Sequence, residues 1–305
     1  MHKVDMQVDL KGLILKNPIT VASGTFGFGR EYEEYMDLNE IGGIMVKGLT
    51  LEPREGNPVP RVAETPMGML NSVGLQNPGV HSFIKNELPY LSQFDTKIIA
   101  NINGNTIEEY CRMAEILSNT SVHAIELNIS CPNVKEGGVA FGVRPEMVYE
   151  VTKKVRENCS KYLIVKLSPN VRDIKEIAAS AEKAGADCLS MINTLMGMAI
   201  DIEKQKPVLA RGIGGLSGPA VKPVALRMVY ETAQTVKIPI IGMGGIMEGS
   251  DAVEFLLAGA EAVSVGTANF INPRAPIDIK DGIEAYLQRK GYKSVGEIVG
   301  KAKIM

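Results

Sequence analysis

The sequence predicts a single α/β domain over residues 1–305, folded as a closed (β/α)8 TIM barrel. Its length of 305 residues is common for one barrel of this kind. Short apolar segments alternate with helical segments, and no linker or low-complexity tract divides them. The apolar segments are continuous, which is typical of parallel strands covered on both faces. The candidate strands are Ile19 to Ala22, Gly43 to Lys47, Lys97 to Asn101, Ala124 to Asn128, Tyr162 to Lys166, Cys188 to Ile192, Ile238 to Gly242 and Ala262 to Val265.

The segments between the strands carry helix boundaries. Asp173 can cap a helix with one apolar face, and Gly185 follows at the place of a left-handed C-cap. Ser250 is expected to open another helix, which ends near Gly259. Repeated strand–helix units predict a parallel sheet with helices outside, and this number of strands favours a closed barrel over an open sheet.

Two segments stand apart from the repeating unit. The stretches Val4 to Leu10 and Leu13 to Lys16 predict an N-terminal β-hairpin, which we expect to cover the bottom of the barrel. Residues Thr50 to Leu91, after the second strand, are rich in proline and too long for an ordinary connection between a strand and its helix. We therefore expect a long functional insertion there.

The composition excludes several classes of protein. The 33 basic and 35 acidic side chains nearly cancel, so no net positive field attracts nucleic acid or an anionic membrane. The first ten residues lack the continuous apolar stretch of a signal peptide or membrane anchor. The four cysteines include no C-x-x-C pair for zinc or an iron–sulfur cluster. We expect a cytoplasmic protein with no metal of its own and no nucleic-acid or membrane partner.

Polar residues close most of the predicted strands. In a barrel of this type the active site lies at the carboxyl ends of the strands. One polar residue there could be a solvated strand end, but a whole set predicts a polar ring around one mouth. The set is Ser23, Lys47, Asn101, Asn128, Lys166 and Asn193.

Glycine closes the last two predicted strands, in Gly242 to Ile246 and Val265 to Ala268. Glycine lets a phosphate approach the backbone, and N–H groups at the N-terminus of the next helix can bind it. Phosphate sites recur at strands seven and eight of such barrels, so we expect a phosphate there. Gly214, Gly215 and Gly218 could add a third wall to this site.

Lys166 is a cation at the end of an apolar segment. Its burial costs several kcal/mol unless an anion or strong acceptor compensates it. A reduced flavin offers negative charge, and the lysine would then stabilise that reduced state. A structural ion pair with a carboxylate is the alternative, and Lys47 permits the same two interpretations.

Cys131 lies in the segment N-I-S-C-P-N, which a loop containing glycines follows. A thiol has a pKa of about 8.5 and can act as a general base where its surroundings favour the thiolate. The glycines would let the loop close over the site and exclude water. A covalent nucleophile is the alternative role. It normally needs an activating histidine, and none of the three histidines has an evident placement near Cys131.

The predicted insertion contains a polar segment of its own, N-S-V-G-L-Q-N-P-G, from Asn71 to Gly79. Its amide side chains and the N–H groups beside its glycines suit a planar ligand with carbonyls and a carboxylate. Taken alone, the segment would indicate only a turn.

A set of motifs, in fixed order over nearly the whole chain, resembles a known family. The motifs are MVKGLT, NSVGLQNPG, ELNISCPN, LIVKLSPN, MINT, GGLSG, MGGI and SVGTA. Together they resemble the class 1 catalytic subunits of dihydroorotate dehydrogenase. The resemblance implies an FMN-binding barrel that oxidises (S)-dihydroorotate to orotate in de novo pyrimidine biosynthesis.

The resemblance also implies roles for individual residues. Cys131 would remove the C5 proton while the C6 hydride passes to flavin N5, and Lys47 would be the second catalytic residue. The residues implied to bind FMN are Ser23, Lys47, Gly48, Asn101, Asn128, Lys166, Ile192, Gly218, Gly244, Gly245, Gly266 and Thr267. Those implied to bind the pyrimidine and its carboxylate are Lys47, Asn71, Ser72, Val73, Gly74, Leu75, Asn128, Asn193 and Thr194. Asn103 lies beside Asn101, so either amide could contact the flavin.

The motifs also bear on the class within the family. The membrane-bound class that uses quinones has an N-terminal hydrophobic extension and a serine base, and this sequence has neither. The segment NISCPNVKEGG is most similar to the NAD-linked class 1B form. That form implies a partner subunit with FAD and a 2Fe–2S cluster, around a homodimeric core within a heterotetramer. A homodimer that reduces fumarate is the alternative.

Two other functions compete with this interpretation. A tRNA dihydrouridine synthase is similar in being an FMN barrel whose cysteine acts on a dihydropyrimidine, but its RNA substrate should demand a basic surface. A non-catalytic barrel that binds a phosphorylated ligand through the Gly244 and Gly266 loops would purify without yellow colour. The motifs favour dihydroorotate dehydrogenase over both.

Overall fold

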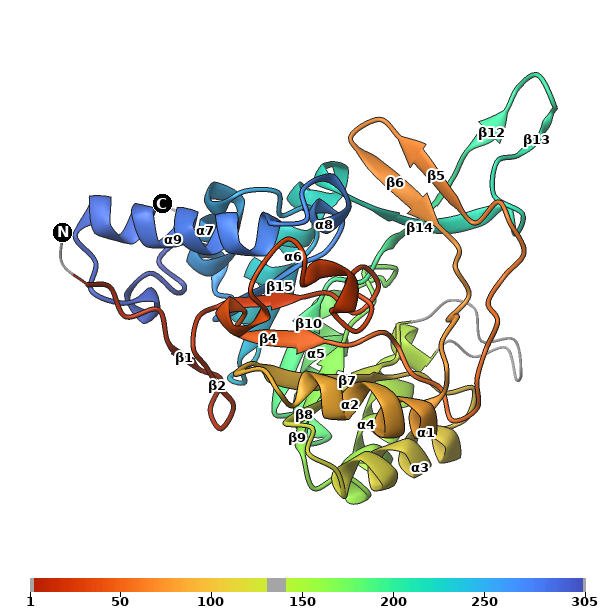
Figure 1. Cartoon of the computed structure of the whole chain (residues 1–305), viewed down its shortest axis with the longest axis horizontal. Coiled ribbons are helices and arrows are strands. Elements are labelled where there is room, and N and C mark those ends of the chain that lie inside the picture. Colours follow the sequence, from red (N-terminus) through yellow and green to blue (C-terminus); the bar gives the residue numbers. More distant parts are fainter. Residues whose placement is uncertain (1–2, 131–140, 304–305) are drawn as a thin grey trace.

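Eight parallel strands form a closed barrel in the computed structural model, which describes residues 3–130 and 141–303 (Figure 1). Each strand pairs with the next along the chain, and the last pairs with the first. All eight coincide with predicted apolar segments, so the predicted fold class is confirmed. The strands are β3 (Ile19–Val21), β4 (Gly43–Met45), β7 (Lys97–Ile102), β8 (Ala124–Asn128), β9 (Tyr162–Lys166), β10 (Cys188–Met191), β15 (Ile240–Met243) and β16 (Ala262–Val265).

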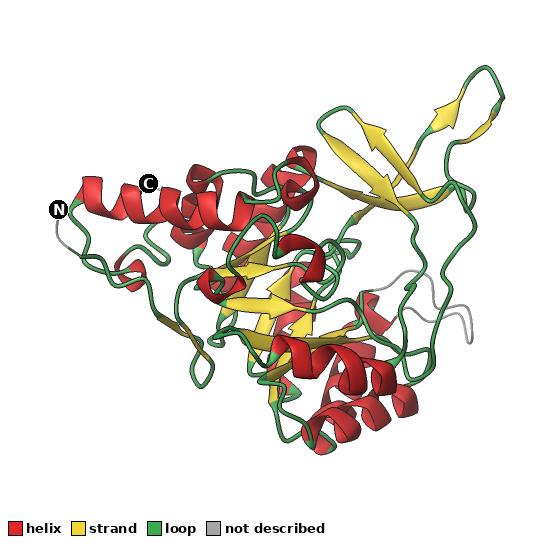
Figure 2. Ribbon diagram, in the orientation of Figure 1, coloured by secondary structure: helices red, strands yellow, loops and turns green. Residues whose placement is uncertain are grey.

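Helices cover the outside of the barrel (Figure 2). The longer ones are α3 (Ile107–Ser118), α4 (Pro145–Glu157), α5 (Ile174–Lys183), α6 (Lys222–Ala233), α7 (Gly249–Ala258) and α9 (Ala275–Lys290). The shorter helices and turns are η1 (Arg30–Tyr32), η2 (Leu38–Glu40), α1 (Val80–Ser82), η3 (Phe83–Glu87), α2 (Leu88–Leu91), η4 (Phe141–Val143), η5 (Pro219–Val221), α8 (Ala268–Ile271) and η6 (Val295–Glu297). Among the described residues, no helix combines the length and apolarity needed to cross a bilayer.

The helix boundaries follow the sequence signals with one correction. The Asp173 side chain accepts a hydrogen bond from the Lys175 amide and caps α5, and Gly185 follows in the left-handed conformation at φ +97°. The expected start of α7 at Ser250 is wrong. The helix begins one residue earlier because Glu248 is its N-cap and forms a reciprocal capping box with Asp251.

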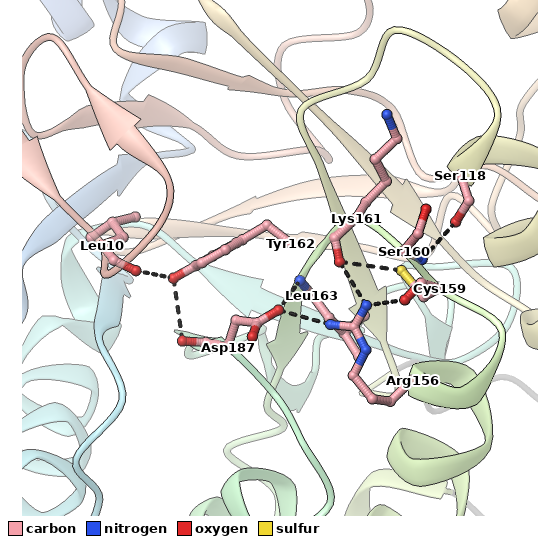
Figure 3. A network of polar contacts seen from close by, with 9 residues as sticks. All are labelled: Leu10, Ser118, Arg156, Cys159, Ser160, Lys161, Tyr162, Leu163 and Asp187. Atoms are coloured by element: carbon pink, nitrogen blue, oxygen red, sulfur yellow. Dashed lines mark hydrogen bonds and ion pairs between the residues drawn. The ribbon is translucent and has the colours of Figure 1, made fainter.

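The predicted N-terminal hairpin is present as β1 (Val8–Asp9) and β2 (Ile14–Leu15), paired antiparallel. The Tyr162 hydroxyl, at the start of β9, donates to the Leu10 carbonyl of this hairpin, and it lies 3.2 Å from the carbonyl of Asp187 (Figure 3). Since β9 begins at Tyr162, the hairpin lies at the amino end of the barrel, the end where we expected it.

An arginine organises the rest of this amino end (Figure 3). Arg156, in the last turn of α4, donates to the Asp187 carboxylate at 2.8 Å and to the Lys161 carbonyl at 2.8 Å. The same carboxylate accepts from the Leu163 amide at 2.8 Å. These contacts tie α4 to the starts of β9 and β10 and leave the opposite end of the barrel for the functional site.

A second sheet, which the sequence did not predict, stands above the carboxyl ends of the barrel strands. Its four antiparallel strands are, in spatial order, β11 (Leu195–Met198), β14 (Ile213–Ser217), β6 (Gly68–Asn71) and β5 (Val62–Thr65). The predicted insertion supplies β5 and β6, and a second insertion after β10 supplies the other two strands. This second insertion also carries the hairpin of β12 (Ile200–Asp201) and β13 (Lys206–Pro207), which projects from the barrel with β5 and β6 (Figure 1).

His123, just before β8, makes the stability of the fold depend on pH. Its Nδ1 accepts a hydrogen bond from the Ile98 amide at 3.1 Å, so the ring must be unprotonated at that nitrogen. Burial lowers the pKa of His123, and the positive charges of Lys97 and Lys161 lower it further. The unfolded chain, with a His pKa of about 6.5, takes up a proton that the folded chain resists. The free energy of unfolding therefore decreases as the pH falls below about 6.5.

We expect His123→Asn to weaken this pH dependence, because asparagine offers an acceptor to the Ile98 amide but does not titrate. Thermal unfolding midpoints measured from pH 8 to pH 5 provide the test. The wild-type midpoint should fall more than that of the variant across this range. Equal losses in the two proteins would show that His123 does not contribute to the acid sensitivity.

Candidate functional site

A cavity of about 570 Å³ lies between the carboxyl ends of the barrel strands and the second sheet. All members of the predicted polar ring contribute to its walls. The described residues that the sequence singled out for FMN or for the pyrimidine all line it: Ser23, Lys47, Gly48, Asn71, Ser72, Val73, Gly74, Leu75, Asn101, Asn128, Lys166, Ile192, Asn193, Thr194, Gly218, Gly244, Gly245, Gly266 and Thr267. Cys131 lies outside the described residues.

The lining also includes residues that the sequence reasoning missed. They include Asn57, Met69, Met196, Arg211, Ile213, Met247 and Phe270. Several of them belong to the second sheet and its connections. The length of the connection between β10 and α6 was an available signal, because ordinary connections of this kind are short.

The second sheet packs closely over the barrel mouth. Gly215 of β14 pairs with Asn71 of β6. A Cβ atom on Gly215 would lie 2.0 Å from the Thr194 Oγ1, so glycine at this position lets β14 pack against Thr194. The Thr267 hydroxyl donates to the Ser217 hydroxyl at 2.8 Å and joins the end of β16 to β14. The cavity is therefore bounded from both sides by directly connected elements.

The charge of the lining is one-sided. Lys47, Lys166 and Arg211 contribute cationic side chains, and no Asp or Glu is found among the described lining residues. Lys166 is 5% exposed, and within the described residues its ammonium has neither a hydrogen bond nor an ion pair. The structural ion pair considered as an alternative for Lys166 is absent from that part of the chain. A cavity of this kind suits a ligand with negative charge.

The loop after β15 has the backbone freedom that a phosphate cradle requires. Gly244 and Gly245 adopt φ values of +126° and +79°, where side chains are strained. A Cβ atom on Gly245 would also lie 2.8 Å from the Lys222 amide nitrogen. The backbone N–H groups of Gly244, Gly245, Gly266 and Thr267 donate no hydrogen bond within the described part of the chain, so they can donate to a ligand.

Two amides just before α7 are engaged within the protein. The N–H groups of Met247 and Glu248 donate to the Asp251 carboxylate at 2.8 and 3.1 Å. Burial acts to raise the pKa of Asp251, but the hydrogen bonds from Lys222 and from these two amides outweigh it and lower the pKa. Thr267, by contrast, is the N-cap of α8, so the expected role of a helix N-terminus in binding phosphate stays a prediction.

An ion-pair cluster holds the cradle from behind. The Lys222 ammonium, at the start of α6, contacts the carboxylates of Asp251 at 2.6 Å and Glu254 at 2.9 Å. The hydrogen bonds to these two carboxylates raise the pKa of Lys222. Because Lys222 also packs against Gly245, this cluster fixes α6, α7 and the glycine loop relative to one another.

Amide side chains form the floor of the cavity. The Asn103 Nδ2 donates to the Asn101 Oδ1 at 2.8 Å, and the Asn128 Nδ2 lies 3.5 Å from the same oxygen. A Cβ atom on Gly48 would lie 2.6 Å from the Asn103 Nδ2, so glycine at position 48 lets the amides pack here. Both Asn101 and Asn103 line the cavity, and the structure leaves open which of them contacts a flavin.

The described cysteines have unreactive surroundings. Cys188 is fully buried, and burial raises the pKa of its thiol well above the ordinary value. Burial also raises the thiol pKa values of Cys159 and Cys111, although Cys111 is only partly buried. No group of three His, Cys, Asp or Glu side chains suited to a metal ion occurs within the described residues.

Comparisons with known proteins agree with the motifs. Residues 5–287 match the family model described as dihydroorotate dehydrogenase. Similar proteins carry the name dihydroorotate dehydrogenase B (NAD+), catalytic subunit. One from Alkaliphilus metalliredigens is 61% identical over 98% of this chain and 99% of its own length. Others, from Caldicellulosiruptor bescii and Bacteroides thetaiotaomicron, are 58% and 56% identical over at least 98% of this chain and 99% of their own lengths.

Proposed function

Because the chain belongs to the dihydroorotate dehydrogenase family, we propose that its cavity binds FMN and dihydroorotate together. The chain is a catalytic subunit of the NAD-linked class 1B type, and it oxidises dihydroorotate in pyrimidine synthesis. The observation that carries the binding proposal is the composition of the cavity. Three cationic side chains and no acidic ones line its described part, which suits a phosphate and a carboxylate in the same space.

The residues present fit FMN. Lys166 is a buried cation that lacks a partner within the described residues, and an anionic isoalloxazine would compensate its charge. Gly244, Gly245, Gly266 and Thr267 offer the phosphate N–H groups that donate to no other described residue. When bound, FMN supplies the acceptor for the C6 hydride of dihydroorotate. The amides of Asn101 and Asn128 lie on the cavity floor, where they would orient the isoalloxazine ring.

The pyrimidine would lie between the flavin and the second sheet. The segment from Asn71 to Leu75 enters the cavity from β6, and Asn193 and Thr194 enter it from the end of β10. Asn193 and Thr194 would hold the pyrimidine carbonyls and N–H groups, while Lys47 would hold the carboxylate. The enclosing sheet excludes water from the reacting carbons.

We assign proton removal to Cys131 and further orientation of the substrate to Lys47. A thiolate at Cys131 would take the C5 proton, which leaves the electrons of the C5–H bond to form the double bond of orotate as the C6 hydride departs. The Lys47 ammonium would stabilise the negative charge of the substrate during this step.

We also propose that electrons leave through a partner subunit that carries FAD and a 2Fe–2S cluster and reduces NAD. The similar proteins are named as catalytic subunits that use NAD+, which supports this assignment over direct fumarate reduction. Among the described residues there is no candidate metal site, and we place the cluster on the partner as part of the proposal. We expect two copies of this chain at the core of a cytoplasmic heterotetramer. The family match also argues against a tRNA dihydrouridine synthase.

The proposal is tested by adding dihydroorotate to the purified protein without oxygen. We expect a yellow protein with one FMN per chain, whose flavin absorbance bleaches as orotate forms. NAD+ should restore the absorbance only when the partner subunit is present. A colourless protein, or a flavin that dihydroorotate leaves oxidised, would contradict the binding proposal. Restoration by fumarate in the isolated chain would contradict only the assigned acceptor.

A further inference from the structure

A carboxylate lies inside the barrel beneath the cavity floor. Glu126, on β8, is 0% exposed and does not line the cavity itself. The Ser190 hydroxyl of β10 donates to its Oε1 at 2.6 Å, and the Asn101 Nδ2 of β7 donates to its Oε2. None of the ion pairs formed by the described residues includes Glu126. A carboxyl group at this depth is costly to bury unless it is hydrogen-bonded, so its partners are informative.

Glu126 is the start of a continuous hydrogen-bond network. The Asn101 Oδ1 accepts from the Nδ2 groups of Asn103 at 2.8 Å and Asn128 at 3.5 Å. The Asn128 Oδ1 in turn accepts from the Ser130 hydroxyl at 2.6 Å. The network reaches the far side of the cavity where the Asn193 Nδ2 donates to that same hydroxyl.

The charge of Glu126 sets the direction of this network. A carboxylate only accepts hydrogen bonds, so Asn101 must turn its NH2 group toward Glu126 and its oxygen toward Asn103 and Asn128. Asn128 must then turn its own oxygen toward Ser130. Without the carboxylate, Asn101 could rotate by half a turn and exchange donor for acceptor at the cavity surface. The orientation of Asn128 agrees with this direction and is also held by the Ser130 backbone N–H, which donates to the Asn128 Oδ1 at 3.3 Å.

We propose that Glu126 is a positioning residue, whose buried carboxylate fixes the donor and acceptor pattern that the cavity floor presents to its ligands. It acts through Asn101 and Asn128 and does not touch the ligand. This inference rests on the proposed function, because a flavin and a pyrimidine are the ligands whose N–H and C=O groups would form hydrogen bonds with these amides. A glutamine at position 126 can donate to the Asn101 Oδ1 and so permits the reversed orientation.

The variants that test the proposal keep the shape of the site. Glu126→Gln is nearly isosteric but removes the acceptor-only character. Glu126→Asp keeps an acceptor-only carboxylate at this position, on a side chain that is one methylene shorter. Ser190→Ala is the control, since it removes one donor and leaves the link to Asn101 intact.

The measurement is the orotate dissociation constant of the FMN-loaded full-length protein, read from the change in flavin absorbance. Flavin reduction by dihydroorotate and the thermal midpoint are recorded for each variant. We expect Glu126→Gln to raise the dissociation constant at least tenfold, and Glu126→Asp to keep it within about tenfold of wild type. Ser190→Ala should stay within about threefold.

The possible outcomes separate this inference from the function on which it rests. A wild-type protein whose flavin does not respond to orotate contradicts the proposed function. If the wild type responds and Glu126→Gln binds orotate equally well, the positioning role is overturned. Should Glu126→Gln fail to fold, Glu126→Asp decides. A folded Glu126→Asp protein that binds orotate within about tenfold of wild type supports the role, and weaker binding or failure to fold overturns it.

Discussion

Replacement of Cys131 by alanine is expected to leave FMN bound but to slow its reduction by dihydroorotate about 100- to 10,000-fold. This range is what a positioned general base contributes. Cys131 follows the end of β8, whose last residue, Asn128, lines the cavity. The substitution removes the group that we propose takes the C5 proton and leaves the described lining unchanged. Anaerobic rapid mixing of dihydroorotate with the FMN-loaded protein measures the rate.

Two further variants sharpen the Cys131 prediction. In Cys131→Ser the hydroxyl has a much higher pKa than the thiol, so it is a weaker base near neutral pH, and the reduction rate should rise toward higher pH. Cys111→Ala, on the outer helix α3, is the matched control and should reduce flavin at the wild-type rate. A Cys131→Ala protein that is reduced as fast as the wild type would remove this residue from the mechanism.

Replacement of Lys166 by methionine is expected to act on the flavin more than on the substrate. The side chain keeps its unbranched apolar stem but loses the ammonium group that we propose compensates the isoalloxazine ring. A hydrogen bond to a charged group contributes about 1.5–3 kcal/mol. The two-electron midpoint potential should therefore fall by roughly 30–60 mV, since about 30 mV corresponds to 1.4 kcal/mol. Spectroelectrochemical titration of the bound flavin measures this shift.

The Lys166 prediction has a control on the protein surface. Lys290→Met, in the exposed last turn of α9, also removes one positive charge and should leave the potential unchanged. The free energy of orotate binding should change less in Lys166→Met than the free energy that corresponds to the shift in the flavin potential. An unchanged potential in Lys166→Met would mean that this ammonium does not compensate the reduced flavin, and that its burial serves another contact.

Much of the site could be predicted from strand ends. Lys47, Asn101 and Lys166 each follow an apolar segment in the sequence, and parallel strands in a closed barrel bring their carboxyl ends to one mouth. The second insertion was not predicted, because Leu195–Met198 and Ile213–Ser217 are short, and they pair with each other and with β6, which is remote in sequence. The residue pattern within a short segment does not predict which remote segment it pairs with.

The role of Glu126 shows why part of the site escaped prediction. Glu126 lies within the apolar segment of β8, and the sequence does not indicate whether its side chain points into the barrel or out of it. That depends on the register of the strand in the barrel. Its partners Asn101 and Ser190 come from two other strands, β7 and β10. These three side chains meet only when the barrel closes.

The barrel, the ring of polar strand ends and the glycine loops follow from the order of residues along the chain, because strand patterning and the residue after each strand are local properties. The cover of the mouth by a second sheet and the direction of the Asn101 oxygen toward Asn103 arise only in the folded molecule. Each of these depends on side chains whose distance and hydrogen-bond direction are set after distant segments have packed together.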